Sequence, residues 1–205
     1  CLASSFEKNG GQIAYNTEAA GIAKTNSGYE VTVTDSQKDS FTLNSNVVIN
    51  CAGLNSDKVA AFVGLEKREY KLKYCKGDYF RLSCTKEANI KHLVYPVPKE
   101  DRGGLGIHIT LDLTGSIRLA PDDEYVENID YKIDPLKAKL FYESVKAFLP
   151  FVKLEDIAPD TSGIRPKLQG EGEGFRDFII RHEDASGFPG FINLIGIESP
   201  GLTAS

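Results

Sequence analysis

Apolar and polar residues alternate in short segments through the first fifty positions, and most segments end at Gly, Asn, Asp or Ser. Alternation with a period of two, bounded by turn-forming residues, is typical of β-strands joined by tight connections. The pattern predicts a small antiparallel sheet that returns to one continuous apolar strand. The predicted strands are Gln12–Tyr15, Ala19–Ala23, Tyr29–Thr34, Phe41–Leu43 and Asn46–Cys51.

A glycine turn joins an apolar strand to the start of a helix at two places along the chain. The first is Ala52-Gly53, and the second falls within residues 187–205. Such a turn leaves backbone N–H groups free to bind an anion or a polarised oxygen, and the helix dipole adds positive potential. Both turns therefore predict a cofactor site. The helix after the first turn spans Asn55–Gly64, with an apolar face of Val59, Phe62 and Val63.

Longer alternating segments fill residues 69 to 183 and predict a mostly antiparallel sheet. One helix interrupts them between Asp134 and Pro150, and we expect it to pack across the sheet. Its predicted apolar stripe consists of Leu136, Leu140, Val145, Phe148 and Leu149. The predicted strands are Tyr70–Leu82, Lys91–Tyr95, Gly104–Leu113, Ser116–Ala120, Thr161–Leu168 and Asp177–His182.

These patterns predict a fold that combines α/β and α+β parts. Residues 1–66 and 188–205 would form an α/β layer, from which residues 67–187 are inserted as a strand-rich α+β domain. Both glycine turns then belong to the first layer. We therefore expect a cofactor-binding domain that carries a substrate-binding domain.

The composition is that of an ordinary globular protein and narrows the range of partners. With 24 Lys and Arg scattered among 29 Asp and Glu, the net charge of −5 argues against a nucleic-acid partner, which demands a basic face. No apolar run approaches the roughly 20 residues that a membrane span needs. The cysteines show no metal-ligand spacing, so we predict no metal site and buried, reduced thiols in an intracellular compartment. They are Cys1, Cys51, Cys75 and Cys84.

Both ends of the chain are abrupt. The N-terminus resembles the back half of a helix that closes on Gly10-Gly11 without an initiating Met, and the second glycine turn is followed by only the start of a helix. We therefore expect the chain to be a piece of a longer protein. Its compartment, cytoplasmic or mitochondrial, stays open because a targeting segment would precede Cys1.

Several motifs along the chain together resemble one family. Their residues and order are similar to those in FAD-dependent oxidoreductases of the D-amino acid oxidase superfamily. Within that superfamily, the motifs most resemble those of the L-2-hydroxyglutarate dehydrogenases and oxidases. The resemblance covers essentially the whole chain and implies a partial FAD-binding domain, Rossmann-like and of the glutathione-reductase type, with an inserted, mostly antiparallel substrate domain. The motifs are Val47–Asp57, Lys76–Phe80, Leu93–Pro98, Gly104–Thr110, Ser162–Lys167 and Gly196–Thr203.

The resemblance implies FAD as the cofactor. It places Ala52 and Gly53 beside FAD, Ala19 near the adenine, and the second glycine turn along the flavin ring, where a helix start would stabilise the negative charge that reduction builds. The family's GxGxxG segment and its Arg-Asn-Ser-Gly-Val-Ile-His segment are absent, so we expect these 205 residues alone to be inactive. The residues of the second turn are Gly196, Ile197, Glu198, Ser199, Pro200, Gly201, Leu202 and Thr203.

His108 is a candidate catalytic base. Side chains alternate between the two faces of a strand, and the apolar residues around His108 occupy one face. His108 therefore lies on the opposite face. There its imidazole, which titrates near neutral pH, could accept the hydroxyl proton of a 2-hydroxy acid while hydride passes to the flavin. The alternative is a solvated or structurally hydrogen-bonded histidine. The apolar face consists of Leu105, Ile107, Ile109, Leu111 and Leu113.

Arg165 is the candidate clamp for a substrate carboxylate, because a guanidinium binds a carboxylate through two parallel hydrogen bonds. The following proline biases Arg165 towards an extended conformation. The resemblance places this segment by the flavin, with Lys167 as a second catalytic cation. Tyr79, Tyr95 and Lys76 are candidate substrate-binding residues, and ordinary surface or packing roles are the alternatives.

The resemblance, together with these residues, implies the FAD-dependent oxidation of a 2-hydroxy acid, L-2-hydroxyglutarate to 2-oxoglutarate, by hydride transfer to flavin. The electron acceptor stays open between oxygen, a quinone and another flavoprotein. One alternative is a related flavin-dependent amine or amino-acid oxidase or a glycerol-3-phosphate dehydrogenase. An alternative of another class is a truncated, non-catalytic homologue or an interaction module.

Overall fold

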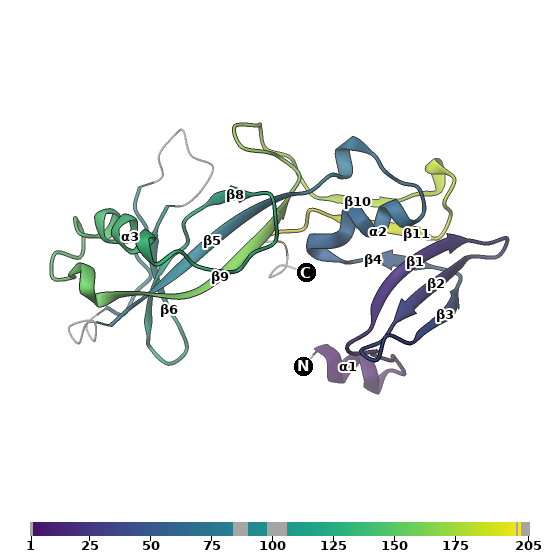
Figure 1. Ribbon diagram of the computed structural model, residues 1–205, viewed down its shortest axis with the longest axis horizontal. Helices are drawn as coiled ribbons and strands as arrows, with labels where there is room; N and C mark the ends of the chain where they lie inside the picture. The colour runs from purple at the N-terminus through teal and green to yellow at the C-terminus, as the bar shows by residue number, and fades with distance from the viewer. Residues whose placement is uncertain (1, 84–89, 98–105, 200, 202–205) are drawn as a thin grey trace. The chain divides into compact units, whose positions relative to one another are not determined.

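The computed structural model describes residues 2–83, 90–97, 106–199 and 201, which form two compact units (Figure 1). Unit 1 consists of Cys1–Lys71 and Asp177–Ile197, and unit 2 of Leu72–Arg176 and Glu198–Ser205. These borders differ from the predicted ones at residues 66/67 and 187/188. The predicted strand Asp177–His182 belongs to unit 1, because it pairs with the last strand of that unit.

Unit 1 contains a three-stranded antiparallel sheet. The predicted alternation holds in its middle strand, where Tyr29 and Val33 are buried. The strand predicted at Gln12–Tyr15 is not formed, because the chain turns there and Asn16 takes a φ of +54°. Helix α1 (Leu2–Lys8) precedes the sheet and buries none of its residues. The strands are β1 (Glu18–Lys24), β2 (Tyr29–Thr34) and β3 (Ser40–Ser45).

A second sheet of unit 1 carries both glycine turns. Its middle strand, β11, pairs in parallel with β4 and antiparallel with β10. Because β4 and β11 are parallel, their carboxyl ends lie at the same edge of the sheet. The strands are β4 (Val48–Asn50), β10 (Ile179–His182) and β11 (Phe191–Ile195).

Helix α2 (Ser56–Phe62) follows the first glycine turn, as predicted. It buries Ser56 and Ala60, and of the predicted face Val63 is buried and Val59 half-buried, whereas Phe62 is 39% exposed. Small side chains let the helix approach the sheet closely, which a phenylalanine at the contact would prevent. The chain leaves the helix at Gly64, whose φ is +82°, in agreement with the predicted C-cap.

Unit 2 is built on a five-stranded antiparallel sheet centred on the long strand β5 (Figure 1). Strand β9 pairs along one whole edge of β5, so β7 and β8 share the other edge, one after the other. The segment Pro121–Asp123 joins β7 to β8 beside the middle of β5. The strands are β5 (Lys73–Leu82), β6 (His108–Leu111), β7 (Ile117–Ala120), β8 (Glu124–Val126) and β9 (Ile157–Lys167).

Two predicted strands are shorter in the structure. Lys91–Tyr95 contributes only a bridge between Val94 and Ile109. The strand predicted at Gly104–Leu113 ends at Leu111, because Asp112 Oδ1 accepts hydrogen bonds from the N–H groups of Thr114 and Ser116 and closes a turn. Leu113 is therefore fully exposed instead of facing the core. The predicted residues 98–105 lie outside the described residues.

The core of unit 2 lies between one face of the sheet and helix α3 (Ala138–Val145). Helix α3 packs across the sheet, with the rings of Phe80 and Phe141 4.3 Å apart. The buried stripe is Phe141, Val145 and Leu149, whereas Leu136 and Leu140 of the predicted stripe are exposed. The 3₁₀ segments of the chain are η1 (Gly53–Asn55), η2 (Arg68–Tyr70), η4 (Pro135–Lys137), η5 (Leu154–Asp156) and η6 (Asp184–Ser186).

The cysteines only partly follow the prediction of buried thiols. Cys75 is buried in β5, but Cys51 is exposed, because β4 ends before it. Cys1 and Cys84 lie outside the described residues. Within the described ranges, no helix has both the length and the apolar character of a membrane span.

Candidate functional site

The two glycine turns come to one edge of the β4–β10–β11 sheet. Gly53 has a φ of +55° and Gly196 a φ of +74°, values at which glycine is favoured. Gly53 is exposed, and no atom lies within 4 Å of the place that a Cβ would take. The turn of Ala52-Gly53 can therefore be approached closely by a ligand, whereas Gly196 is buried and Ile197 half-buried.

The other predicted cofactor residues are spread over the chain. Ala19 lies in β1, in the first sheet of unit 1, beside a bulge. Glu198 and Ser199 line cavities of unit 2, and the carbonyl of Glu198 accepts a hydrogen bond from the Gly201 N–H at 2.6 Å. Pro200, Leu202 and Thr203 lie outside the described residues.

A buried pair of asparagines holds the first glycine turn. The side-chain amide of Asn50, the last residue of β4, donates to the Ser56 carbonyl at 2.7 Å and to Asn193 Oδ1 at 2.8 Å. Its own Oδ1 accepts a hydrogen bond from the Ala52 N–H at 3.3 Å. Asn193 lies opposite Asn50 in β11 and donates to Glu183 Oε1 at 2.9 Å. The pair thus joins the strand end, the turn and the start of α2.

Glu183 is the charged end of this hydrogen-bond network and is fully buried. It accepts hydrogen bonds from the Tyr70 hydroxyl at 2.5 Å, the Ser186 hydroxyl at 2.9 Å and the Lys67 ammonium at 3.2 Å. Burial alone would raise the pKa of this carboxyl, but the hydrogen bonds outweigh burial and lower the pKa from 4.5 to about 2. Glu183 is therefore ionised at neutral pH and serves the fold of unit 1.

Unit 2 contains a cavity of about 430 Å³ on the face of β5 that α3 leaves free. We call it the His108 cavity. Gly77 of β5 pairs directly with Gly163 of β9 in its floor, so the sheet carries no side chain at these two neighbouring positions. The side chains around this gap belong to Tyr79, Tyr95, His108 and Arg165, and the segment Pro121–Asp123 forms another wall.

His108 is 5% exposed and lines this cavity. Its ring stacks on that of Tyr95, with centroids 4.2 Å apart. His108 Nδ1 lies 2.8 Å from the Gly106 carbonyl oxygen, which can only accept a hydrogen bond. Nδ1 therefore carries the proton, and in the neutral ring Nε2 is the atom that can accept one. The histidine is buried at a cavity and not solvated.

Arg165 and Lys167 project from β9 beside Glu198. Arg165 Nη1 lies 3.8 Å and Lys167 Nζ 3.0 Å from the Glu198 carboxylate. Arg165 also donates a hydrogen bond to Cys75 Sγ at 3.4 Å, and burial raises the pKa of that thiol. A second cavity of about 750 Å³, the Lys167 cavity, adjoins this group, and Arg165 and Glu198 line both cavities.

The predicted substrate-binding residues separate into two groups. Tyr79 and Tyr95 both line the His108 cavity, together with His108 and Arg165. Lys76 lines neither cavity. Its ammonium donates to the Lys132 carbonyl and lies 3.5 Å from Asp78 Oδ1, and its side chain is almost buried. The structure therefore places Lys76 apart from the other candidates, which line one or both cavities.

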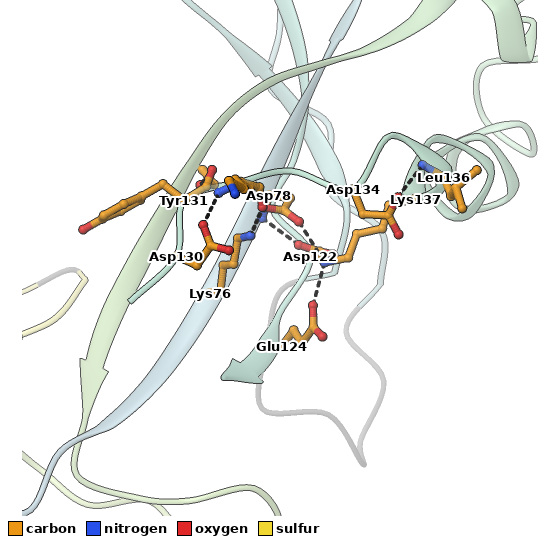
Figure 2. Close-up of polar contacts among 11 residues, drawn as sticks. Lys76, Asp78, Asp122, Glu124, Asp130, Tyr131, Asp134, Leu136 and Lys137 are labelled. Carbon is orange, nitrogen blue, oxygen red and sulfur yellow. Dashed lines mark hydrogen bonds and ion pairs between the residues drawn. The ribbon is translucent and has the colours of Figure 1, made fainter. Parts of the chain in front are cut away.

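Behind the His108 cavity, Lys137 forms ion pairs with three carboxylates (Figure 2). Its Nζ lies 2.8 Å from Asp78, 2.9 Å from Asp122 and 2.7 Å from Glu124. Burial alone would lower the pKa of Lys137, but the hydrogen bonds to these carboxylates outweigh it and raise the pKa. Asp122 also accepts the Asp78 N–H at 2.7 Å and lines the cavity, so this cluster fixes the cavity wall.

The sequence patterns did not single out Gly77, Gly163 or Lys137. Glycine inside a strand marks a place where a ligand or another backbone approaches closely, so Gly77 within Lys73–Leu82 was a usable signal. The pairing of Gly77 with Gly163 joins positions far apart in the chain, and no local pattern encodes it. In the part of the chain that the structure describes, no three or more His, Cys, Asp or Glu residues form a group that could hold a metal ion.

Comparison with known families and proteins gives matches over the whole chain. The family model described as FAD dependent oxidoreductase matches residues 1–205. A mitochondrial L-2-hydroxyglutarate dehydrogenase from Arabidopsis thaliana is 41% identical over 172 residues, which cover 78% of this chain and 35% of that protein. An L-2-hydroxyglutarate dehydrogenase from Indibacter alkaliphilus is 24% identical over 99% of this chain and 57% of its own length.

Solved structures share the fold. A dithionite-reduced L-alpha-glycerophosphate oxidase from Mycoplasma pneumoniae with FAD bound matches all of this chain and 51% of its own, with a TM-score of 0.77 and 25% identity. A glycine oxidase from Bacillus cereus matches 98% of this chain and 50% of its own, with a TM-score of 0.71 and 16% identity. This chain therefore spans about half the length of the solved proteins and between 35% and 57% of the two dehydrogenases.

Proposed function

The chain belongs to the FAD-dependent oxidoreductase family, and we propose that the whole protein oxidises a 2-hydroxy acid, L-2-hydroxyglutarate, to the corresponding 2-oxo acid. The fold class predicted from the sequence is confirmed by solved structures with the same fold, one of which has FAD bound. The proposal on substrate is supported by the dehydrogenase from Arabidopsis thaliana, at 41% identity. The activity is proposed for the whole protein because this chain spans only part of its relatives.

The residues at the glycine turns of unit 1 suit the approach of FAD. The backbone of Ala52, Gly53, Gly196 and Ile197 lies at one sheet edge, and no atom lies within 4 Å of the place that a Cβ on Gly53 would take. The Asn50–Asn193 pair holds the first of these turns in place. FAD, when bound, supplies the hydride acceptor of the reaction. Contacts from Ala19 and from Glu198–Thr203 to FAD remain predictions.

The observation that carries the proposal is that His108 and Arg165 line one cavity in unit 2. Arg165 holds the carboxylate of the substrate through its guanidinium fork. His108 Nε2 accepts the hydroxyl proton, because Nδ1 is already engaged with Gly106. The hydroxyl groups of Tyr79 and Tyr95 are available to orient the substrate in the same cavity.

The experiment is an anaerobic titration of the full-length protein, with loss of flavin absorbance as the measurement. We expect L-2-hydroxyglutarate to bleach the flavin, and glycine, other amines and glycerol 3-phosphate not to do so. Bleaching by one of these instead would contradict the proposed substrate. Glycerol 3-phosphate belongs in the panel because a glycerol 3-phosphate dehydrogenase from Caloramator mitchellensis is 27% identical over the whole chain. A full-length protein that binds no flavin would favour a non-catalytic homologue.

A further inference from the structure

Glu198 contacts both candidate cations of β9, and the two contacts are unequal. Lys167 Nζ lies 3.0 Å from Oε1, with the two side chains only 11% and 10% exposed. Arg165 Nη1 lies 3.8 Å from Oε2, which is beyond hydrogen-bond length. Oε2 is buried and makes no hydrogen bond with the residues that the structure describes. Glu198 is thus paired closely with Lys167 and loosely with Arg165.

Arg165 keeps donors for a ligand. Besides Glu198, its recorded contact among the described residues is the one to Cys75 Sγ, at 3.4 Å. Its side chain is 31% exposed and lines both cavities. A guanidinium has five N–H donors in a rigid fork, so Arg165 can hold a carboxylate with two of them while the Lys167–Glu198 pair stays closed.

The three charges sum to one positive charge at the place where the cavities meet. Asp123 also lines both cavities, but it is exposed, and solvent screens it more than the buried Glu198. One uncompensated positive charge suits one of the two carboxylates of L-2-hydroxyglutarate. Without Glu198, Lys167 would offer a second cation roughly 6.6 Å further along the strand, a spacing that a five-carbon diacid can span.

We propose that Glu198 is the counter-ion of the carboxylate site: it neutralises Lys167 and leaves Arg165 as the single carboxylate clamp. Glu198 is then a positioning and selectivity residue, and Lys167 does not bind the substrate. The choice of a carboxylate ligand rests on the proposed function. The carboxylate binding itself can be measured without turnover.

The test is calorimetric titration of the full-length, FAD-loaded protein with glutarate and with butyrate, which are unreactive probes with two and one carboxylates. We expect Glu198→Gln to bind glutarate about tenfold more tightly than the parent, because Lys167 is freed, and butyrate to gain less. Glu171→Gln is the matched control, since Glu171 is exposed on the rim of the Lys167 cavity, and it should bind both probes as the parent does. Unchanged or weaker glutarate binding by folded Glu198→Gln would overturn the proposal.

A double variant guards against misfolding, because Glu198→Gln leaves the nearly buried Lys167 without its partner. Lys167→Gln with Glu198→Gln removes the pair without leaving a lone charge. We expect this variant to bind butyrate at least as tightly as the parent and to lose any gain for glutarate. A loss of butyrate affinity of more than about tenfold would show that Lys167 binds the carboxylate, and would overturn the proposal.

The result is separable from that of the proposed function. If the parent does not oxidise L-2-hydroxyglutarate and Glu198→Gln still binds glutarate more tightly, the proposed function fails and the counter-ion role stands. If the parent oxidises L-2-hydroxyglutarate and Glu198→Gln binds glutarate no more tightly, only the counter-ion role is overturned.

Discussion

Gly77 and Gly163 face each other across the β5–β9 pair, and together they keep the floor of the His108 cavity free of side chains. The two positions differ in their surroundings. A Cβ on Gly77 would come 2.9 Å from Pro121 Cβ and 3.0 Å from the Asp122 carbonyl oxygen. A Cβ on Gly163 would meet no atom within 4 Å. A methyl group added at Gly163 therefore tests whether the cavity binds substrate, whereas a methyl group added at Gly77 tests the packing against Pro121.

Gly163→Ala should reduce substrate binding without loss of stability. The methyl group enters empty cavity space, and alanine loses less conformational entropy than glycine, so stability should stay equal or rise by up to about 1 kcal/mol. We expect KM to rise several-fold, measured by steady-state kinetics of the full-length protein. Gly77→Ala should instead lower the free energy of unfolding by roughly 1–3 kcal/mol, because Pro121 must move. An unchanged KM for Gly163→Ala would place the substrate elsewhere.

Arg165→Ala should raise KM strongly, because the substrate carboxylate loses its fork of donors. Arg165→Lys should not restore KM, since an ammonium is a point charge without that geometry. Steady-state kinetics with L-2-hydroxyglutarate, alongside flavin content as a check on folding, measures both. A KM equal to that of the parent in either variant would remove Arg165 from the site.

His108→Ala should lower kcat by roughly 10²–10⁴-fold if Nε2 is the general base. Flavin content should not change, because His108 lies in unit 2 and its recorded contacts are with Gly106 and Tyr95. His92→Ala is the matched control, since His92 is exposed and should tolerate the change. A kcat within a few-fold of the parent for His108→Ala would leave the histidine a structural role only.

The local pattern predicted elements well where one face clearly differs from the other. Tyr29–Thr34 alternates along its length, and the predicted strand is confirmed. The helix between Asp134 and Pro150 carries apolar residues on two adjoining stripes, and the pattern alone favoured Leu136 and Leu140 over Phe141. Only the position of Phe80 on the sheet decides which stripe is buried.

The site was predictable to the extent that strand periodicity determines it. Side chains alternate along a strand, so Lys76 and Tyr79 point to opposite faces of β5, and only Tyr79 lines the His108 cavity. The bonds that hold the glycine turn could not be predicted in this way. Asn50 and Asn193 meet only because β4 and β11 pair in parallel, and their side chains are far apart in the chain.

Lys137→Met should destabilise unit 2, because Asp78 is fully buried and would lose an ion-pair partner at 2.8 Å. We expect the free energy of unfolding to fall on the order of 3 kcal/mol, measured by urea denaturation. Lys139→Met, a change of the same kind at an exposed position on α3, should alter it by less than about 0.5 kcal/mol. Equal effects of the two variants would mean that the cluster in Figure 2 contributes little to stability.

Glu183 should make unit 1 sensitive to acid. Its pKa is lowered from 4.5 to about 2 in the folded protein. The stabilisation is therefore fully present above pH 4.5 and is lost as the pH falls towards 2, and it amounts to about 3 kcal/mol. Glu183→Gln should remove this part of the pH dependence, measured as the free energy of unfolding between those pH values. The same slope in parent and variant would contradict the assignment.

The segment Pro121–Asp123 leaves the edge of β5 after β7 and rejoins it as β8, while β9 runs unbroken along the other edge. The β5–β9 pair, which holds the sheet together, and the Pro121–Asp123 segment, which forms a wall of the cavity, are therefore separate segments of the chain. Residues can be exchanged, added or removed in a connection of this kind without shifting the register of the strands beside it. Substrate scope in this fold can thus diversify at a short interruption of the sheet edge, while the long β5–β9 pair conserves the architecture.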